Sequence, residues 1–228
     1  MTRAIAALVR HGDYAQAKGV PSAQQPYPLT ETGLQQATDC GSQLAALAAS
    51  LGRPLAPVIH CSRQLRAWQT ASRIAEVLSP GHVLLETSDL SERRMGSAAN
   101  LTVAEIEAAL AADPRFPAPP EGWKADRNYR LPYEGAESMV DAGRRVADWI
   151  DATVSQDPAK AGFIIVFVGH GAAFRHAACE LGALEAPEVA KLSMHHARPV
   201  LLERQAPGRW QKIAGDWKQR SARDSATD

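Results

Sequence analysis

The sequence predicts a three-layer α/β/α fold, with a mostly parallel sheet and helices on both faces. Two apolar runs, residues 4–9 and 163–168, contain no polar alternation, which is typical of strands buried on both faces of a parallel sheet. Segments with helical periodicity follow the strand-like segments, as expected when helices connect parallel strands. The chain has 228 residues, of which 45% are hydrophobic and 22% charged, so it can bury a full core. We expect one domain over residues 1–228.

The first half of the chain has a regular order of strands and helices. Thr30 is a suitable N-cap for the first helix, because its hydroxyl oxygen can accept a hydrogen bond from a free N–H of the first turn. Ser62 is expected to cap the second helix in the same way, and Leu65 and Trp68 are expected to point from that helix into the core. The predicted elements are strands at 4–9, 57–61 and 83–87 and helices at 31–51 and about 63–78.

The second half is interrupted by an insertion at about residues 93–135. This segment holds one predicted helix, about 102–112, followed by four prolines within seven residues of the chain, 114–120. It is too short to build a core without help, so we interpret it as a small cap inserted in the domain. The later elements are helices at about 137–154 and 170–182, a strand at 163–168, and strands at 199–202 and 210–213 that are expected at sheet edges.

Composition excludes several classes of protein. Lys plus Arg equals Asp plus Glu at 25 each, which gives no support for nucleic-acid binding. Cys40, Cys61 and Cys179 lack the spacing of a zinc site or a disulfide framework, which favours a reduced, cytoplasmic protein. No targeting signal or long apolar segment is apparent, so no membrane association is expected. Oligomeric state is open, a homodimer included.

Two predicted strands deliver a histidine at the same edge of the sheet. Arg10 and His11 follow the first strand, and His170 stands between two glycines after the strand at 163–168. Ligands of open parallel sheets bind beyond the carboxyl ends of the strands. Arg66 lies in the first turn of the helix after the second strand, where a cation is unfavourable for the helix dipole. It is either a solvated or salt-bridged arginine or, as its place after a strand end favours, a phosphate ligand.

These residues resemble the motifs of the histidine phosphatase superfamily, also called phosphoglycerate mutase-like. Six motifs occur in the order of that family and span about residues 5–185. They are Arg10-His11-Gly12; Leu29-Thr30 with Gly33 and Gln36-Ala37; Ser62 with Arg66-Ala67 and Gln69-Thr70-Ala71; Leu90 with Glu92; Glu137-Ser138; and Gly169-His170-Gly171. The Trp-Asn and Gly-Trp features of cofactor-dependent mutases are missing from residues 13–28, which favours the phosphatase branch.

The resemblance implies a phosphoglycerate mutase-like fold and a phosphohistidine mechanism without cofactor or metal. His11 would be the catalytic nucleophile, and Arg10, Arg66 and His170 would bind the phosphoryl oxygens together with it. Glu92 would protonate the leaving group, which requires a raised pKa or the nearby phosphate dianion. The alternative for Glu92 is an ion pair with Arg93 or Arg94.

The predicted function is that of a histidine acid phosphatase-type phosphomonoester hydrolase acting on a small phosphorylated metabolite. The alternatives are a mutase-type phosphotransferase and a non-catalytic phospho-ligand binding protein. Four cations of the cap, Arg93, Lys124, Arg127 and Arg130, are candidate contacts for a second part of the substrate, or form a solvated surface. His195 and His196 form a potential metal pair, but neighbouring residues point in different directions, so surface or structural roles are expected.

Overall fold

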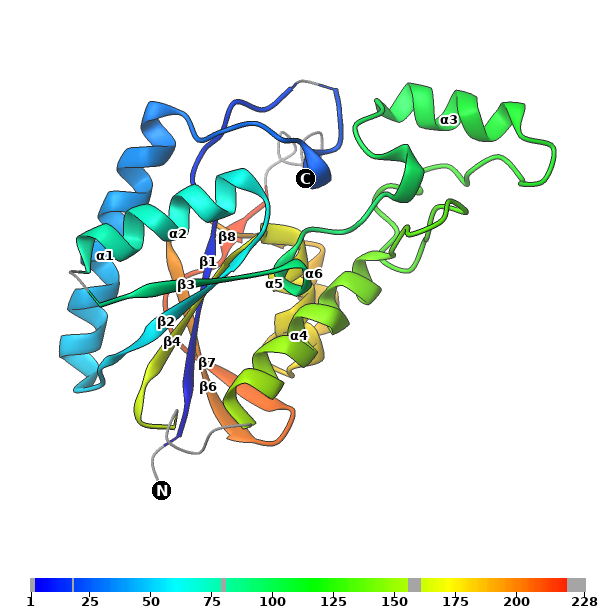
Figure 1. The fold of residues 1–228 in the computed structure, drawn as a ribbon. Coiled ribbons are helices and arrows are strands. Elements are labelled where there is room, and N and C mark those ends of the chain that lie inside the picture. The colour runs from blue at the N-terminus through cyan, green and yellow to red at the C-terminus, as the bar shows by residue number, and fades with distance from the viewer. Residues whose placement is uncertain (1–2, 18, 79–80, 156–160, 221–228) are drawn as a thin grey trace.

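The computed structural model describes residues 3–17, 19–78, 81–155 and 161–220, so the predicted domain ends, 1 and 228, lie outside the described residues. Six strands form one sheet in the order β3-β2-β4-β1-β6-β7 (Figure 1). β1, β2, β3 and β4 pair in parallel, whereas β6 and β7 are antiparallel. The bounds are β1 (Ile5–Arg10), β2 (Leu55–Ser62), β3 (Val83–Thr87), β4 (Ile164–Gly169), β6 (Pro199–Ala206) and β7 (Arg209–Ala214). The predicted mostly parallel sheet is therefore confirmed.

Only one of the two late strands lies at the sheet edge. β7 does, as expected, but β6 pairs with both β1 and β7, so its prediction as an edge strand was wrong. β6 is an interior strand because it pairs in antiparallel fashion with β1 on one side and with β7 on the other, and its first residues are buried. Two short strands, β5 (Leu192–Ser193) and β8 (Lys218–Gln219), form a separate antiparallel pair.

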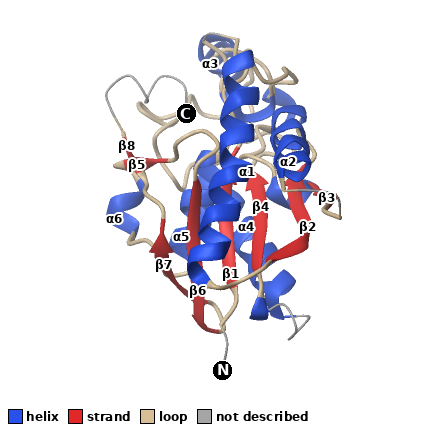
Figure 2. Ribbon diagram, turned by 90° about the vertical axis from the view of Figure 1, so that its left-hand side faces the viewer, coloured by secondary structure: helices blue, strands red, loops and turns tan. Residues whose placement is uncertain are grey.

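Helices cover both faces of the sheet, which gives the three expected layers. Ala6 and Leu8 of β1 pack in one apolar cluster with α4 and α5, while Ala7 and Val9 pack in another with α1 and α2. α1 lies in front of the sheet in Figure 2. The helices are α1 (Glu31–Leu51), α2 (Leu65–Val77), α3 (Val103–Ala112), α4 (Met139–Ser155), α5 (Gly171–Glu180) and α6 (Ala186–Val189), with short 3-10 turns at Ser22–Gln24, Ser88–Leu90 and Gly96–Ala98.

The first two helices begin differently from one another. Thr30 caps α1 as predicted, with its Oγ1 accepting from the Gly33 N–H at 3.0 Å. Ser62 does not cap α2: it ends β2, and Gln64 stands at the N-cap position without a side-chain cap. Leu65 and Trp68 are 40% and 38% exposed, so their predicted inward orientation was wrong. The buried face of α2 combines two polar residues, described below, with Ala67, Ala71 and Ile74, and a pattern of apolar residues alone does not reveal a mixed face of this kind.

The insertion forms a small cap over the carboxyl ends of the strands. A bridge between Met95 and Ala136 and a hydrogen bond from Glu137 N to Arg94 O at 2.8 Å close its base. Its apolar cluster includes Ala23, which comes from the segment before α1. Residues 93–135 therefore pack against a residue from outside this segment, and α3 extends away from the sheet (Figure 1).

Cys40, Cys61 and Cys179 are free thiols. Among the described residues, no helix has both the length and the apolar character needed to cross a membrane.

Candidate active site

Three separate backbone segments bring His11, Arg66 and His170 into contact. Arg10 and Gly169 are opposite one another in the parallel β1–β4 pair, and His11 N donates to Gly169 O at 2.9 Å. The two imidazole rings that follow these positions lie 5.2 Å apart between centroids. Arg66 lies between them, with Nε 3.1 Å from His11 Nε2 and Nη2 3.2 Å from His170 Nδ1. The edge that the sequence predicted for the site is therefore where these three side chains meet.

The hydrogen bonds determine which nitrogen of each ring is unprotonated. A guanidinium can only donate, so His11 Nε2 and His170 Nδ1 are both acceptors. His11 Nδ1 donates to Gly12 O at 2.8 Å, and His170 Nε2 donates to Ser62 Oγ at 3.0 Å. Each ring is thus a neutral imidazole with one lone pair directed toward Arg66. His11 Nε2 is the atom available as a nucleophile.

Burial and neighbouring cations keep both imidazoles neutral. Desolvation, followed by the charge of Arg66, lowers the pKa of His11 well below its ordinary value. The same two causes, in the same order, lower the pKa of His170 well below its ordinary value. The unprotonated forms therefore persist at neutral pH and into mild acid. An anion bound beside them would act in the opposite direction and favour a protonated His170.

Arg66 is a buried cation that backbone carbonyls hold in place. It is 1% exposed, and it donates from Nη1 to Gln25 O at 2.8 Å and from Nη2 to Ala23 O at 3.2 Å. The Tyr14 ring lies under the guanidinium, 4.7 Å from Cζ to the ring centroid. Burial lowers its pKa to about 10, which leaves it charged at neutral pH. The segment before α1 thus closes over the site and fixes the direction of this guanidinium.

Glu92 is anchored at the N-terminus of α5. Its carboxylate accepts from Ala172 N at 3.1 Å, from Ala173 N at 2.9 Å and from Arg93 N at 3.0 Å. Arg94, one of the ion-pair partners considered from the sequence, instead contacts Glu137 at 3.9 Å. Glu92 is only 8% exposed, and the helix end that holds it begins directly after His170. The carboxylate is therefore fixed beside the histidine pair by backbone donors.

Two glycines allow this close packing. A Cβ on Gly12 would lie 2.5 Å from the carbonyl oxygen of Gly33, and a Cβ on Gly171 would lie 3.1 Å from Arg10 Cδ. Arg10 therefore runs along the first turn of α5, where its Nη1 also donates to Met194 O at 3.0 Å. A larger residue at position 171 would displace Arg10 from beside His170.

The structure adds residues that sequence reasoning missed. The ring of His196 lies 5.7 Å from the His11 ring, and the ring of Tyr14 lies 5.3 Å from it. His196, for which a surface or structural role was expected, lies beside His11 because the loop before β6 returns to the site. The signal that was available is topological: the residues preceding a strand antiparallel to β1 lie at the same edge as the residues following β1.

The four candidate cations of the cap separate into two pairs. Arg93 and Lys124 line a small pocket of about 20 Å³ together with Glu92. Arg127 Nη2 instead lies 4.0 Å from Cys179 Sγ, near the far end of α5, and Arg130 pairs with Asp141 at 2.6 Å. The site therefore includes Arg93 and Lys124 at its border, whereas Arg127 and Arg130 have partners elsewhere.

Within the described residues, no three His, Cys, Asp or Glu side chains are grouped in a way that could hold a metal ion. Among the described residues, the potential metal pair of His195 and His196 is therefore not joined by a third ligand of these four types.

Comparison with known proteins identifies similar chains. A sequence model described as the histidine phosphatase superfamily (branch 1) matches residues 6–214. No protein with a curated description matches the chain in sequence.

Solved structures show the same fold at low identity. A mycobacterial glucosyl-3-phosphoglycerate phosphatase is 23% identical with a TM-score of 0.71, over 96% of this chain and 100% of that one. A structure titled mycobacterial hydrolase 2 is 24% identical with a TM-score of 0.72, over 99% and 96%. A putative α-ribazole-5'-phosphate phosphatase from Escherichia coli is 17% identical with a TM-score of 0.69, over 92% and 96%.

Proposed function

Because this chain belongs to branch 1 of the histidine phosphatase superfamily, we propose that it is a phosphomonoester hydrolase that works through a phosphohistidine on His11. The observation that carries this proposal is the unprotonated Nε2 of His11, directed at the buried guanidinium of Arg66. A neutral nucleophile next to fixed cations is the arrangement that phosphoryl transfer needs, since catalysis there is mostly positioning and charge stabilisation. The solved phosphatases with this fold are consistent with such an activity.

In the first step, the lone pair of His11 Nε2 forms a bond to phosphorus while the bond from phosphorus to the ester oxygen breaks. Arg10, Arg66 and His170 bind the three non-bridging oxygens of the phosphoryl group. Arg66 already has both imidazole lone pairs within 3.2 Å, so an incoming phosphoryl group takes its place between residues that are already oriented. The Nδ1–H of His11 remains bonded to Gly12 O, which stabilises the ring as it gains positive charge.

Glu92 supplies the proton that the leaving oxygen requires. In this step its carboxyl group transfers a proton to the ester oxygen as that bond breaks. In the second step the resulting carboxylate takes a proton from water, whose oxygen attacks phosphorus. Inorganic phosphate leaves, and His11 regains its lone pair. The small pocket lined by Glu92, Arg93 and Lys124 lies beside this carboxyl group.

The test is release of inorganic phosphate from a panel of phosphomonoesters, with wild type, His11→Ala and a control, His82→Ala, in a loop of the chain. We expect wild type and the control to release phosphate, and His11→Ala to lose about 10⁴-fold or more in kcat. Acid-labile labelling of wild type, absent from His11→Ala, would identify the phosphohistidine. Activity of His11→Ala equal to wild type would overturn the proposal, as would transfer of phosphate only between hydroxyls of phosphoglycerate.

A further inference from the structure

A cationic pocket lies next to the phosphate site on the side away from the cap. We propose that this pocket binds a second anionic group of the substrate, a carboxylate or a second phosphate, so that the preferred substrates are phosphomonoesters with two anionic ends. The inference rests on the proposed function, because it assumes that His11 and Arg66 hold the first phosphate. It assigns substrate selection to the loop before β6 and to the strand pair β5–β8.

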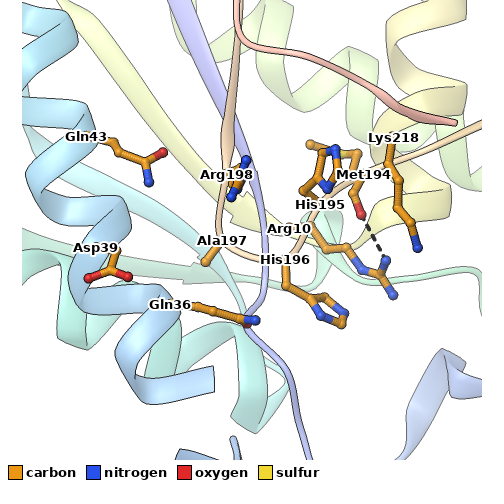
Figure 3. A pocket seen from close by; sticks show the side chains of 10 residues that line it. All are labelled: Arg10, Gln36, Asp39, Gln43, Met194, His195, His196, Ala197, Arg198 and Lys218. Carbon is orange, nitrogen blue, oxygen red and sulfur yellow. Dashed lines mark hydrogen bonds between the residues drawn. The ribbon is translucent and has the colours of Figure 1, made fainter. Parts of the chain in front are cut away.

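The pocket has the size and position of a ligand subsite. Its volume is about 310 Å³, within the range of small-molecule sites in proteins. Figure 3 shows Arg10, His196 and Lys218 on one side of it and Gln36 and Asp39 of α1 on the other. Its walls therefore come from β1, α1, the β5–β6 loop and β8, four segments far apart in the sequence.

Positive charge dominates the walls of this pocket. Arg10, Arg198 and Lys218 are cations, whereas Asp39 is the one carboxylate among its lining residues. Asp39 accepts a hydrogen bond from Gln35 Nε2 at 2.8 Å. Within the described residues Arg198 has no ion pair and no side-chain hydrogen bond, and it is exposed. An excess of cations in a concave site attracts anions, and a guanidinium is suited to the oxygens of a carboxylate or phosphate.

Arg10 and His196 connect the pocket to the phosphate site. Both line the pocket, and the His196 ring is 5.7 Å from the ring of His11. Arg10 lies against Gly171, in the same helical turn whose next two N–H groups hold Glu92. Arg10 therefore borders both the pocket and the helical turn that holds Glu92.

The backbone of the β5–β6 loop is held in an unusual conformation at this place. Ala197 has φ of +47°, which is uncommon for a residue with a Cβ and costs conformational energy. Its N–H donates to Arg10 O at 2.8 Å, which ties the loop to the end of β1. The residues on either side of Ala197 are His196 and Arg198, and both line the pocket. The strained residue thus fixes the loop segment that presents these two side chains.

The opposite border of the site has less space for a second anion. The pocket lined by Glu92, Arg93 and Lys124 measures about 20 Å³, enough for roughly one water molecule. Arg130, another cation of the cap, is paired with Asp141. The difference in volume therefore favours the pocket beside α1.

The test compares paired substrates that differ in one anionic group. 3-Phosphoglycerate and glycerol 3-phosphate differ by a carboxylate, and fructose 1,6-bisphosphate and fructose 6-phosphate differ by a phosphate. The variant is the double substitution Arg198→Gln with Lys218→Gln. The control, Arg209→Gln with Lys191→Gln, removes the same net charge from exposed positions outside the pocket.

We expect wild type to prefer the doubly anionic member of at least one pair in kcat/KM. The pocket variant should lose about 10-fold to 100-fold of that preference, mainly through KM, while the control retains it. The pair that loses its preference shows whether the second group is a carboxylate or a phosphate. A preference that is absent in wild type, unchanged in the pocket variant, or lost only in Lys124→Gln would overturn the inference.

A binding measurement separates this inference from the proposed function. Titration calorimetry of His11→Ala with 3-phosphoglycerate and with fructose 1,6-bisphosphate requires no turnover. If wild type hydrolyses none of the four compounds, tighter binding of a doubly anionic compound than of its partner, lost on adding the two pocket substitutions, would still support the pocket. Equal binding of both members of each pair would reject it.

Discussion

Arg66 and Arg130 were both candidates from the sequence for contact with the substrate, yet the structure gives them different surroundings. Arg66 is 1% exposed and donates to two imidazoles and two backbone carbonyls. The side chain of Arg130 is 59% exposed and pairs with Asp141, a carboxylate at the start of α4. Arg66 lies in the first turn of α2, at the carboxyl ends of the parallel strands (called the strand edge below), and Arg130 lies in the cap.

The two regions differ in the partners that surround a positively charged side chain. At the carboxyl ends of the strands, the buried guanidinium of Arg66 donates to neutral acceptors, two imidazoles and two backbone carbonyls. In the cap, the cation is already neutralised by its partner and is screened by water. Exposed ion pairs of this kind contribute about 0–1 kcal/mol to stability. The residues at the carboxyl ends of the strands are therefore oriented to bind an anion, whereas the charge of Arg130 in the cap is already paired with Asp141.

The largest effect on this comparison is expected from Glu92→Gln. An amide cannot donate the proton that the leaving oxygen needs, so kcat should fall by about 10²–10⁴-fold. Phosphate affinity should remain, because Arg66 and the two histidines are untouched. Both are measurable, as kcat for a phosphomonoester with a poor leaving group and as inhibition by inorganic phosphate. Unchanged kcat would mean that another residue is the acid.

Arg66→Lys tests whether geometry or charge matters at the strand edge. Lysine keeps the charge but has a single nitrogen, which cannot meet both imidazoles and the carbonyls of residues 23 and 25. We expect kcat/KM to fall by about 10²–10³-fold. A matched Arg130→Lys variant should leave kcat/KM within about twofold of wild type. Equal losses in the two variants would contradict the distinction between the regions.

Acid should destabilise the fold through its buried histidines. Burial lowers the pKa of His176 to about 4 and lowers those of His11 and His170 well below 6.5. Below pH 6.5 the unfolded chain binds these protons while the folded chain does not, so stability falls as the pH falls. For His176 alone the loss between pH 7 and pH 5 is about 2 kcal/mol.

Urea denaturation at the two pH values measures this loss. His176→Gln should reduce the difference in unfolding free energy between pH 7 and pH 5, and His82→Gln, at a loop position, serves as the control. Identical pH dependence of wild type and His176→Gln would show that folding does not lower the pKa of His176.

The smallest effect is expected from Arg130→Gln. Loss of its exposed pair with Asp141 should change the unfolding free energy by no more than about 1 kcal/mol, because Ser138 N and Oγ still donate to Asp141. Thermal denaturation and kcat/KM for a phosphomonoester check both regions at once. A loss of activity above about tenfold would place Arg130 in the substrate site.

The sequence located the strand edge well, because backbone chemistry determines it. Continuous apolar runs identify parallel strands, and the carboxyl ends of parallel strands lie at one edge, so His11 and His170 were expected at the same edge of the sheet. The buried face of α2 could not be predicted in the same way. Its inward face carries Arg66 and Thr70, and Thr70 Oγ1 accepts from Gly12 N at 3.0 Å. Polar residues that are buried for the site look like surface residues in a hydrophobic pattern.

The sequence by itself determined the three-layer fold, the strand edge and its two histidines, because these depend on local periodicity and on the direction of parallel strands. Only the tertiary structure decided that Ala23 and Gln25 hold Arg66, that His196 joins the site, and which cap cations have other partners. Those contacts join segments far apart in the chain, and nothing in the local pattern of either segment specifies its partner. Burial then decides the chemistry, because desolvation, followed by the charge of Arg66, lowers the pKa of both imidazoles and keeps them neutral.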